Sequence, residues 1–299
     1  MKTYLDCIPC FFRQALYSSR MSGASKKTQK KVLDQLARII PKISLESSPP
    51  EMARVIHQQM YKLTKKYDPY SHVKKQSNDM ALKVYPKLKS KVNHSQDKLL
   101  MATELAIAGN IIDYGAKHSL NVNDELKKIL KQESKTIKKE SRAIFNYAEF
   151  KSCLKKAQTI LYLADNAGET VFDRVLIEEI KRVDSSKEII YAVKEKPAIN
   201  DALIEDAYYC GIDKIAKVMS SGVDAPGTVL SLCSKKFLKV YRNADMIISK
   251  GQGNFEALSN TRRPIFFMFM AKCPVIAREV NCNVGDVILF YHAVEKRKK

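Results

Sequence analysis

The second half of the chain alternates short apolar runs with amphipathic segments, and this alternation limits the folds open to it. The pattern predicts strands at 159–164, 188–193, 215–219, 245–249, 265–270 and 287–291, and helices at 170–180, 199–209 and 227–238. Strands that alternate with helices indicate an α/β fold, a mostly parallel sheet with helices on both faces. In such sheets ligands bind beyond the carboxyl ends of the strands, so candidate functional residues are sought there.

The first two strand ends carry oxygen-bearing side chains. Asp165 and Asn166 follow the first strand directly, before a small turn and a predicted helix start. Carboxylate and amide oxygens suit a hard divalent cation, and the helix N-terminus suits a phosphate. Pro197 stops the second strand, and Asp201, at the predicted start of the next helix, could complete the cation site. Asx turns or helix N-caps explain these residues equally well.

The next three strand ends carry groups that suit an anion. Ser221 and Gly222 follow the third strand, and hydroxyl and backbone N–H groups are the usual components of an anion cradle. Lys250 closes the fourth strand beside Gly251, and Lys272 follows the fifth, so two cations could neutralise a phosphoryl group. Each position has a purely structural explanation, yet all these groups belong to one edge of one sheet. The combination favours a catalytic site.

Residues 1–150 show helical periodicity with few β-rich runs, which predicts a helical N-terminal domain beside an α/β domain over 151–299. Ser95 could cap a long helix whose apolar face continues to Ile112. Asn110 and Asp113 are three residues apart and therefore share one face of that helix. Such a polar pair could also form hydrogen bonds inside the core.

The net charge of +20 is the strongest bulk property, and most of the excess lies in residues 1–150 as dispersed lysines. A field of this sign could attract nucleic acid. The chain has no Trp, few arginines beside its lysines, and no run of interleaved basic and aromatic residues. We therefore favour a solvated lysine-rich surface over a nucleic-acid partner.

Cysteine usage and hydropathy indicate a cytoplasmic protein without a membrane partner. The apolar runs are too short to span a bilayer, and the N-terminus has no secretory signal. Seven scattered cysteines do not form a disulfide framework. Cys7 and Cys10 form a C-x-x-C pair, which with Cys273 could hold a second metal or act as a redox pair, although buried helical thiols are the simpler interpretation.

At these residues the chain resembles the DUF89 family, the damage-control phosphatases, and within it small prokaryotic members with an N-terminal C-x-x-C. The matching pieces are Cys7 and Cys10 followed by Gln14, and then residues 106–115, 164–169, 196–201, 221–228, 249–256 and 272–275. They occur in family order over nearly the whole chain. Asp-Asn-Ala-Gly-Glu at 165–169 and Lys-Gly-Gln-Gly-Asn-Phe-Glu at 250–256 are the most specific pieces.

The resemblance implies one divalent metal ion, held by Asp165, Asn166 and Asp201, with manganese, cobalt, nickel or magnesium supporting activity. It also implies hydrolysis of small phosphomonoesters, including sugar phosphates and damaged phosphometabolites. Asn110 and Asp113 are expected to face the active site. The residues expected to bind the substrate phosphate are Asn110, Asp113, Ser221, Gly222, Lys250, Gly251, Asn254 and Lys272.

The mechanistic hypothesis is direct attack by metal-activated water. Lys250 and the donors around Ser221 would stabilise the transferring group, and either Glu169 or Asp201 would orient the water. A covalent aspartyl-phosphate mechanism needs a second Asp two residues after the first, where this chain has Ala167. Two other classes remain as alternatives: a basic nucleic-acid-binding protein, and an S-adenosylmethionine-dependent methyltransferase whose glycine-rich turns hold the cofactor.

Overall fold

A seven-stranded sheet lies at the centre of the molecule, in the order β1-β7-β6-β5-β2-β3-β4. The structure is a computed structural model, and it describes residues 1–110 and 144–293. Neighbouring strands are parallel except β6 and β7, which pair antiparallel. The predicted mostly parallel α/β fold is thus confirmed. The strands are β1 (Ile144–Phe145), β2 (Thr159–Leu163), β3 (Glu188–Val193), β4 (Lys217–Ser220), β5 (Met246–Lys250), β6 (Ile265–Met270) and β7 (Val287–His292).

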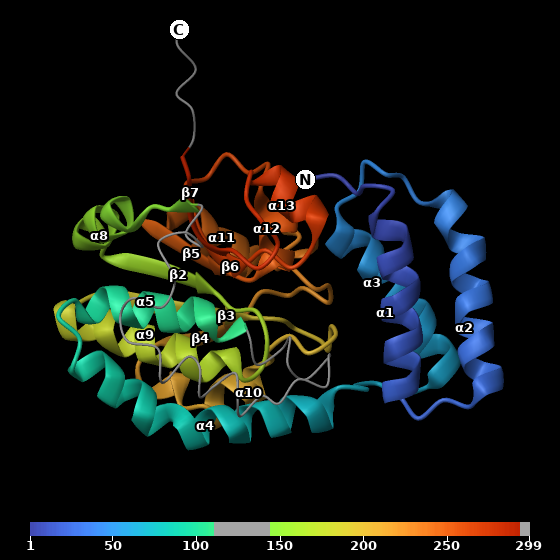
Figure 1. Ribbon diagram of the computed structural model, residues 1–299, viewed down its shortest axis with the longest axis horizontal. Coiled ribbons are helices and arrows are strands. Elements are labelled where there is room, and N and C mark those ends of the chain that lie inside the picture. Colours follow the sequence, from blue (N-terminus) through green and yellow to red (C-terminus); the bar gives the residue numbers. More distant parts are fainter. Residues whose placement is uncertain (111–143, 294–299) are drawn as a thin grey trace, which may run out of the picture.

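Helices cover both faces of this sheet, as predicted (Figure 1). One face carries α4 (Ser71–Asn93), α5 (Lys98–Ala108), α8 (Tyr147–Lys156), α9 (Glu169–Val183) and α10 (Ile204–Tyr209). The other carries α11 (Lys235–Asn243), α12 (Gln252–Leu258) and α13 (Pro274–Glu279). Helix α9 packs on the sheet and is covered in turn by α4 and α5, so it is buried almost all round.

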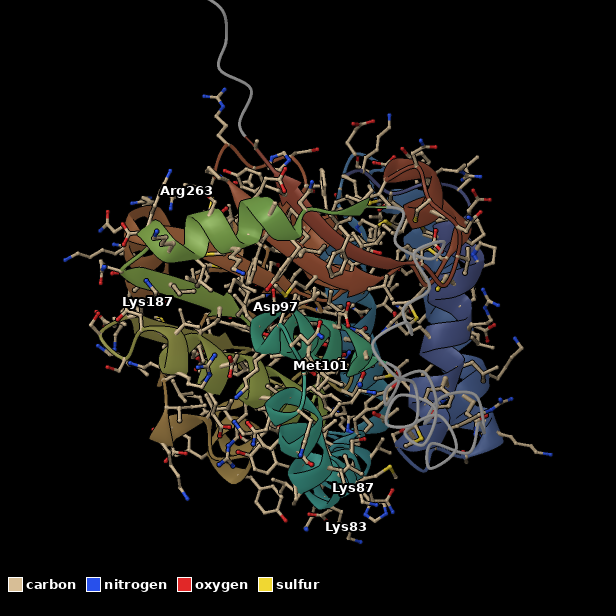
Figure 2. All side chains as sticks on the ribbon, turned by 60° about the vertical axis from the view of Figure 1, so that its left-hand side comes forward. Lys83, Lys87, Asp97, Met101, Lys187 and Arg263 are labelled. Carbon is tan, nitrogen blue, oxygen red and sulfur yellow. The ribbon has the colours of Figure 1, made fainter. Side chains whose placement is uncertain are left out.

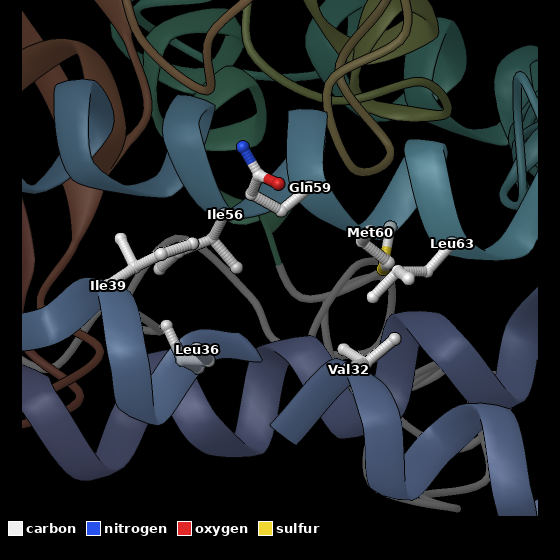
Figure 3. A pocket seen from close by; sticks show the side chains of 7 residues that line it. All are labelled: Val32, Leu36, Ile39, Ile56, Gln59, Met60 and Leu63. Carbon is white, nitrogen blue, oxygen red and sulfur yellow. The ribbon is translucent and has the colours of Figure 1, made fainter. Parts of the chain in front are cut away.

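The first three helices, α1 (Cys7–Met21), α2 (Lys26–Ile39) and α3 (Pro49–Thr64), pack together around an apolar core of their own. Figure 1 shows them beside the sheet. A capping box of Ser48 and Glu51 begins α3. Helix α3 meets the loop after β4, where the Arg54 guanidinium pairs with Asp224. Figure 3 shows a small pocket between α2 and α3, apolar apart from Gln59, which lies within this helical group.

Helices α4 and α5 belong by their packing to the α/β body, because their apolar residues share one core with β2, β3 and α9. The division at residue 150 remains a prediction. The predicted cap of the α5 region is wrong. Asp97 caps α5 by accepting from the backbone N–H of Leu100 at 3.0 Å, whereas the Ser95 hydroxyl donates to the Lys91 carbonyl just beyond the end of α4. None of the helices within 1–110 and 144–293 is both long and apolar enough to cross a membrane.

Two predicted helices begin later than the sequence pattern indicates. Residues 199–203 are not helical, because Asp201 forms an antiparallel bridge with Asn166 and only the segment from Ile204 continues as α10. The helix predicted over 227–238 is replaced by a short 3-10 turn and by α11, which Ser234 caps. Asp201 is therefore not at a helix start, and Ser221 and Gly222 do not immediately precede a helix.

The strand order reverses at β2, since β3 and β4 extend the sheet on one side and β5 and β6 on the other. Ligands of open α/β sheets bind at such a switch point, outside the carboxyl ends of the strands. Strands β2 and β5 pair in register from Ile160 with Met246 to Leu163 with Ser249. The segments that follow them, which begin with Ala164 and Gly251, therefore leave the sheet side by side.

Candidate active site

The two candidate metal-binding segments meet outside the end of β2. Asp201 bridges Asn166, the backbone N–H of Ala167 donates to the Asn200 carbonyl at 2.9 Å, and that of Ala202 donates to the Asp165 carbonyl at 2.8 Å. Asp165, Asn166 and Asp201 are all buried. The structure thus brings the three predicted ligands together. Their role as ligands remains a prediction.

Strong negative charge accumulates at this place. Burial raises the pKa of Asp165 well above its usual range, and the carboxylates of Glu169 and Asp201 raise it further. Two ammonium groups, those of Lys272 and Lys194, act in the opposite direction. Lys194 forms an ion pair with Asp201, with Nζ and Oδ2 3.4 Å apart. Neighbouring carboxylates that are shielded from water and raise one another's pKa form a suitable place for a cation.

The donor set fits a hard divalent ion. Asp165 and Asp201 supply carboxylate oxygens, and Asn166 supplies an amide whose nitrogen donates to Asp165 Oδ2 at 2.9 Å and to Glu169 Oε1 at 2.8 Å. Across the described residues no group of three His, Cys, Asp or Glu side chains is arranged to hold a metal. A site at this position would therefore combine two carboxylates with an amide or backbone oxygen, which suits magnesium or manganese.

Glu169, in the first turn of α9, is the centre of a buried polar network. Its Oε2 accepts from Asn110 Nδ2 at 2.9 Å and from Lys250 Nζ at 3.2 Å, and its side chain is 0% exposed. Burial raises the pKa of Glu169, while Lys250 and Lys272 lower it. Both carboxylate oxygens of Glu169 thus accept hydrogen bonds. Through Oε1, Glu169 fixes the position of the Asn166 side chain.

Lys250 lies deeper than the sequence predicts. Its ammonium group contacts Glu169 and also Asp173 Oδ1, at 2.7 Å, and its side chain is 0% exposed. The Asp173 carboxylate accepts two further hydrogen bonds, from the hydroxyls of Tyr162 at 2.7 Å and Tyr191 at 2.8 Å. Because Lys250 is enclosed in this way, it is better placed to hold the Glu169 carboxylate than to reach a ligand. Direct contact with a phosphoryl group remains a prediction.

The structure explains why residue 251 is a glycine. A Cβ at this position would lie 2.0 Å from Asp165 Cγ, and its backbone has φ +79°. The backbone after β5 therefore packs directly on the Asp165 carboxylate, and a side chain here would displace it.

The Asn254 side chain connects the segments that follow three strands. Its Nδ2 donates to the carbonyls of Ala164 and Lys250 at 3.0 and 2.8 Å. Its Oδ1 accepts from the backbone N–H of Thr228 at 2.7 Å and from Lys194 Nζ at 3.4 Å. The Asn254 side chain is fully engaged in holding the loops after β2, β4 and β5 together.

The remaining predicted residues lie around this centre or outside the described chain. The N–H of Ser221 donates to the Val193 carbonyl at 2.8 Å and that of Gly222 to Ser220 Oγ at 3.0 Å, so these two backbone donors of the predicted anion cradle have protein partners. Lys272 is partly buried, and Gln252 Oε1 accepts from its backbone N–H at 2.9 Å. Asp113 lies outside the described residues. The phosphate-binding roles remain predictions.

The cysteines of the C-x-x-C pair lie in the first turn of α1. Cys7 is partly buried, which raises the pKa of its thiol, and Cys10 is exposed. Cys273 Sγ accepts from Gln252 Nε2 at 3.6 Å. The interpretation as two buried helical thiols therefore fails for Cys10.

Sequence reasoning missed Lys194, Asp173 and the tyrosine pair. Lys194 directly follows the apolar strand β3, and a lysine at that point was a usable signal. Asp173 lies one helical turn after Glu169 on an otherwise apolar face of α9. Tyr162 and Tyr191 occupy facing positions of β2 and β3, and this requires knowledge of the strand register.

Fold and site together define an α/β protein with a carboxylate-rich site at the switch point of its sheet. The family model of the damage-control phosphatase ARMT1-like domain matches residues 3–288. The chain belongs to this family, which supports a phosphatase function. The predicted resemblance is thus confirmed.

Two relatives named as damage-control phosphatases and one uncharacterized protein are similar to this chain over most of its length. A damage-control phosphatase of Pyrococcus horikoshii is 36% identical over 96% of this chain and 97% of its own length. A damage-control phosphatase of Archaeoglobus fulgidus is 32% identical over 96% and 98% of the two chains. An uncharacterized protein of Methanocaldococcus jannaschii is 36% identical over 95% and 93%. The crystal structure of a DUF89 family protein from P. horikoshii superposes with a TM-score of 0.85 at 32% identity, over 97% of this chain and 99% of that one.

Proposed function

We propose that the protein is a divalent-metal-dependent phosphatase that hydrolyses small phosphomonoesters, such as sugar phosphates or damaged phosphometabolites. The observation that carries the proposal is the bridge between Asn166 and Asp201, which gathers the carboxylates and the amide at the switch point. Manganese, cobalt, nickel and magnesium are the candidate ions. The family supports the phosphatase class, and metal dependence and substrate are part of the proposal.

Asp165, Asn166 and Asp201 would hold the cation. When bound, a divalent ion lowers the pKa of an attacking water molecule and offsets charge on the phosphoryl group. We assign the orientation of the water to Asp201, which would hold the ion beside it. Glu169, whose oxygens accept from Asn110, Asn166 and Lys250, would keep Asn166 in place. Of the two alternatives that the sequence leaves open, we thus propose Asp201.

Two lysines are the best candidates for stabilising the transferring phosphoryl group. The charges of Lys272 and Lys194 both act on Asp165, which indicates that their ammonium groups lie near the carboxylates. Positive groups fixed in a dry site stabilise the charge that develops in a phosphoryl-transfer transition state. Lys250 would contribute differently, by keeping Glu169 ionised and in place to hold Asn166.

The test is phosphate release from p-nitrophenyl phosphate and a panel of sugar phosphates, with metal-stripped protein to which manganese, cobalt, nickel or magnesium is added. Asp165→Asn should lower metal-restored turnover at least about 100-fold, the loss typical of one group that stabilises charge. Asp245→Asn is the matched control, because Asp245 lies at the opposite end of the β2–β5 pair and accepts from Gln158 and Thr159. Its turnover should match wild type.

Two results would contradict the proposal. Turnover that needs no added metal would exclude metal dependence, and undiminished turnover in Asp165→Asn would place the chemistry elsewhere. Phosphate trapped covalently on Asp165 would replace attack by water with an aspartyl-phosphate mechanism.

A further inference from the structure

Helix α4, from the N-terminal half, contacts the first candidate metal segment. The Asn78 side chain is 2% exposed, and its Oδ1 accepts from the backbone N–H of Gly168 at 2.6 Å. Gly168 has φ +82°, and a Cβ there would lie 2.9 Å from Ser77 Cβ. The turn that follows Asp165 and Asn166 is therefore pressed against α4 and hydrogen-bonded to it.

The same side chain reaches the second candidate metal segment. Asn78 Nδ2 donates to Asp206 Oδ1 at 2.8 Å, and Asp206 Oδ2 accepts from the Leu203 N–H at 2.9 Å, two residues after Asp201. Lys74 Nζ pairs with Asp206 at 3.5 Å and with Asp68, in the segment between α3 and α4, at 2.8 Å. A continuous buried polar chain thus runs from the start of α4 to both segments.

The segment that contains Asp201 needs such support. Ile199 has φ +52°, a left-handed conformation that costs a branched residue free energy. Strained backbone of this kind persists only where surrounding contacts hold it. Backbone hydrogen bonds to the Asp165 loop hold it on one side, and the Asn78–Asp206 contact holds the start of α10 on the other.

We propose that Asn78 is a positioning residue of the metal site, which fixes the distance between the Asp165–Asn166 turn and the Asp201 segment. Only a side chain with an acceptor and a donor can serve Gly168 and Asp206 at once, and an amide has both. The inference rests on the proposed metal site. It adds to that site a determinant of metal affinity that lies on a helix remote in sequence from the ligands.

A purely structural role for Asn78 predicts a different result. If the contact only stabilised packing, its loss would lower the melting temperature and leave the affinity of the folded protein for metal unchanged. Groups that orient metal ligands, in contrast, typically change metal affinity by about 10–100-fold when they are removed. Affinity measured well below the melting temperature therefore separates the two roles.

The experiment is calorimetric titration of metal-stripped protein with Mn²⁺. Asn78→Asp keeps the acceptor for Gly168 but removes the donor and places a second carboxylate against Asp206, so binding should weaken by about 10–100-fold. The double variant Asn78→Asp/Asp206→Asn exchanges acceptor and donor at unchanged net charge, so most of the affinity should return. Lys187→Met is the matched destabilised control and should bind Mn²⁺ as wild type does.

Lys187 suits this purpose because it is also buried, and it donates to the Ala157 carbonyl at 2.6 Å. Figure 2 shows it at the edge of the molecule away from α1–α3. Wild-type affinity in Asn78→Asp, or a double variant that recovers none of the loss, would overturn the positioning role. If wild type itself binds no Mn²⁺, the metal site fails instead, and the two failures are told apart without any variant.

Discussion

Replacement of Lys250 by Met tests whether the buried network under the site is held together by charge. The ammonium group contacts Glu169 at 3.2 Å and Asp173 at 2.7 Å, and all three side chains are 0% exposed. Removal of one partner from a buried ion pair costs about 3–5 kcal/mol of unfolding free energy, because an uncompensated charge remains. Each carboxylate keeps two hydrogen-bond donors here, the amides at Glu169 and the tyrosine hydroxyls at Asp173, so we expect a loss of about 3 kcal/mol.

The loss should depend on pH. Burial already raises the pKa of Glu169, and Lys250 is the largest opposing influence, so without it the carboxyl keeps its proton to higher pH. The unfolded chain ionises at the ordinary pKa, and the folded variant therefore binds more protons than the unfolded one as pH rises. Its unfolding free energy then falls with increasing pH. The penalty should be smaller at pH 5 than at pH 8.

Urea unfolding of the metal-free protein, followed by circular dichroism at both pH values, measures these losses. Lys187→Met is again the control. Lys187 is similarly buried, but within the described part of the chain it pairs with the partly exposed Asp184, at 3.2 Å, and with one carbonyl. It should cost about 1 kcal/mol. A loss for Lys250→Met no larger than that of the control, or equal at the two pH values, would refute the reasoning.

Three further predictions follow from single contacts. Gly251→Ala should abolish turnover and Mn²⁺ binding, because the new Cβ would displace the Asp165 carboxylate. Gly285→Ala is the control and should keep both, because Gly285 also has a positive φ, +96°, but open space around it. The phosphatase assay and the Mn²⁺ titration measure the two effects. Burial raises the pKa of Glu256 to about 7, so this group stabilises the fold below pH 4.5 and loses that contribution as pH rises through 7. In Glu256→Gln the melting temperature should accordingly fall less between pH 5 and 8 than it does in wild type. The same fall in both proteins would contradict this prediction. Mn²⁺ at 100 times its Kd should add about 2.7 kcal/mol to wild-type stability and less to Asp201→Asn, as chemical unfolding with and without metal would show.

Much of the site could be predicted because parallel sheets bring the ends of distant strands to one edge. Asp165, Asp201 and Gly251 follow three different strands, and the structure places them in contact or in neighbouring segments. No knowledge of side-chain packing was needed for this step. Strand periodicity and the position of the strand ends were enough.

The failures concern interactions between segments far apart in sequence. Asn200 and Asp201 look like a helix start by composition, yet pairing with Asn166 draws them into a bridge. Lys250 looks like a solvent-facing strand end, and its burial depends on Asp173 from α9. Local propensity carries no information about either contact, since tertiary partners decide in which conformation the polar groups find hydrogen bonds.

Asn78 lay beyond sequence reasoning for a related reason. In α4 it is one polar residue among several, in a helix whose periodicity indicates only an amphipathic surface. Its function becomes visible once the turn at Gly168 and the start of α10 are seen to converge on it.

The burial of most of α9 also constrains how the chain is made. Helices α4 and α5 leave the ribosome before α9 does, and most side chains of α5 are buried in the finished fold, against partners that include α9 and β6. Until α9 and β6 have been synthesised, that apolar helix lacks much of its final cover. Because domains fold as units during synthesis, the nascent chain would carry an exposed hydrophobic hairpin for several seconds. Residues 1–110 released early should therefore be held by chaperones or aggregate.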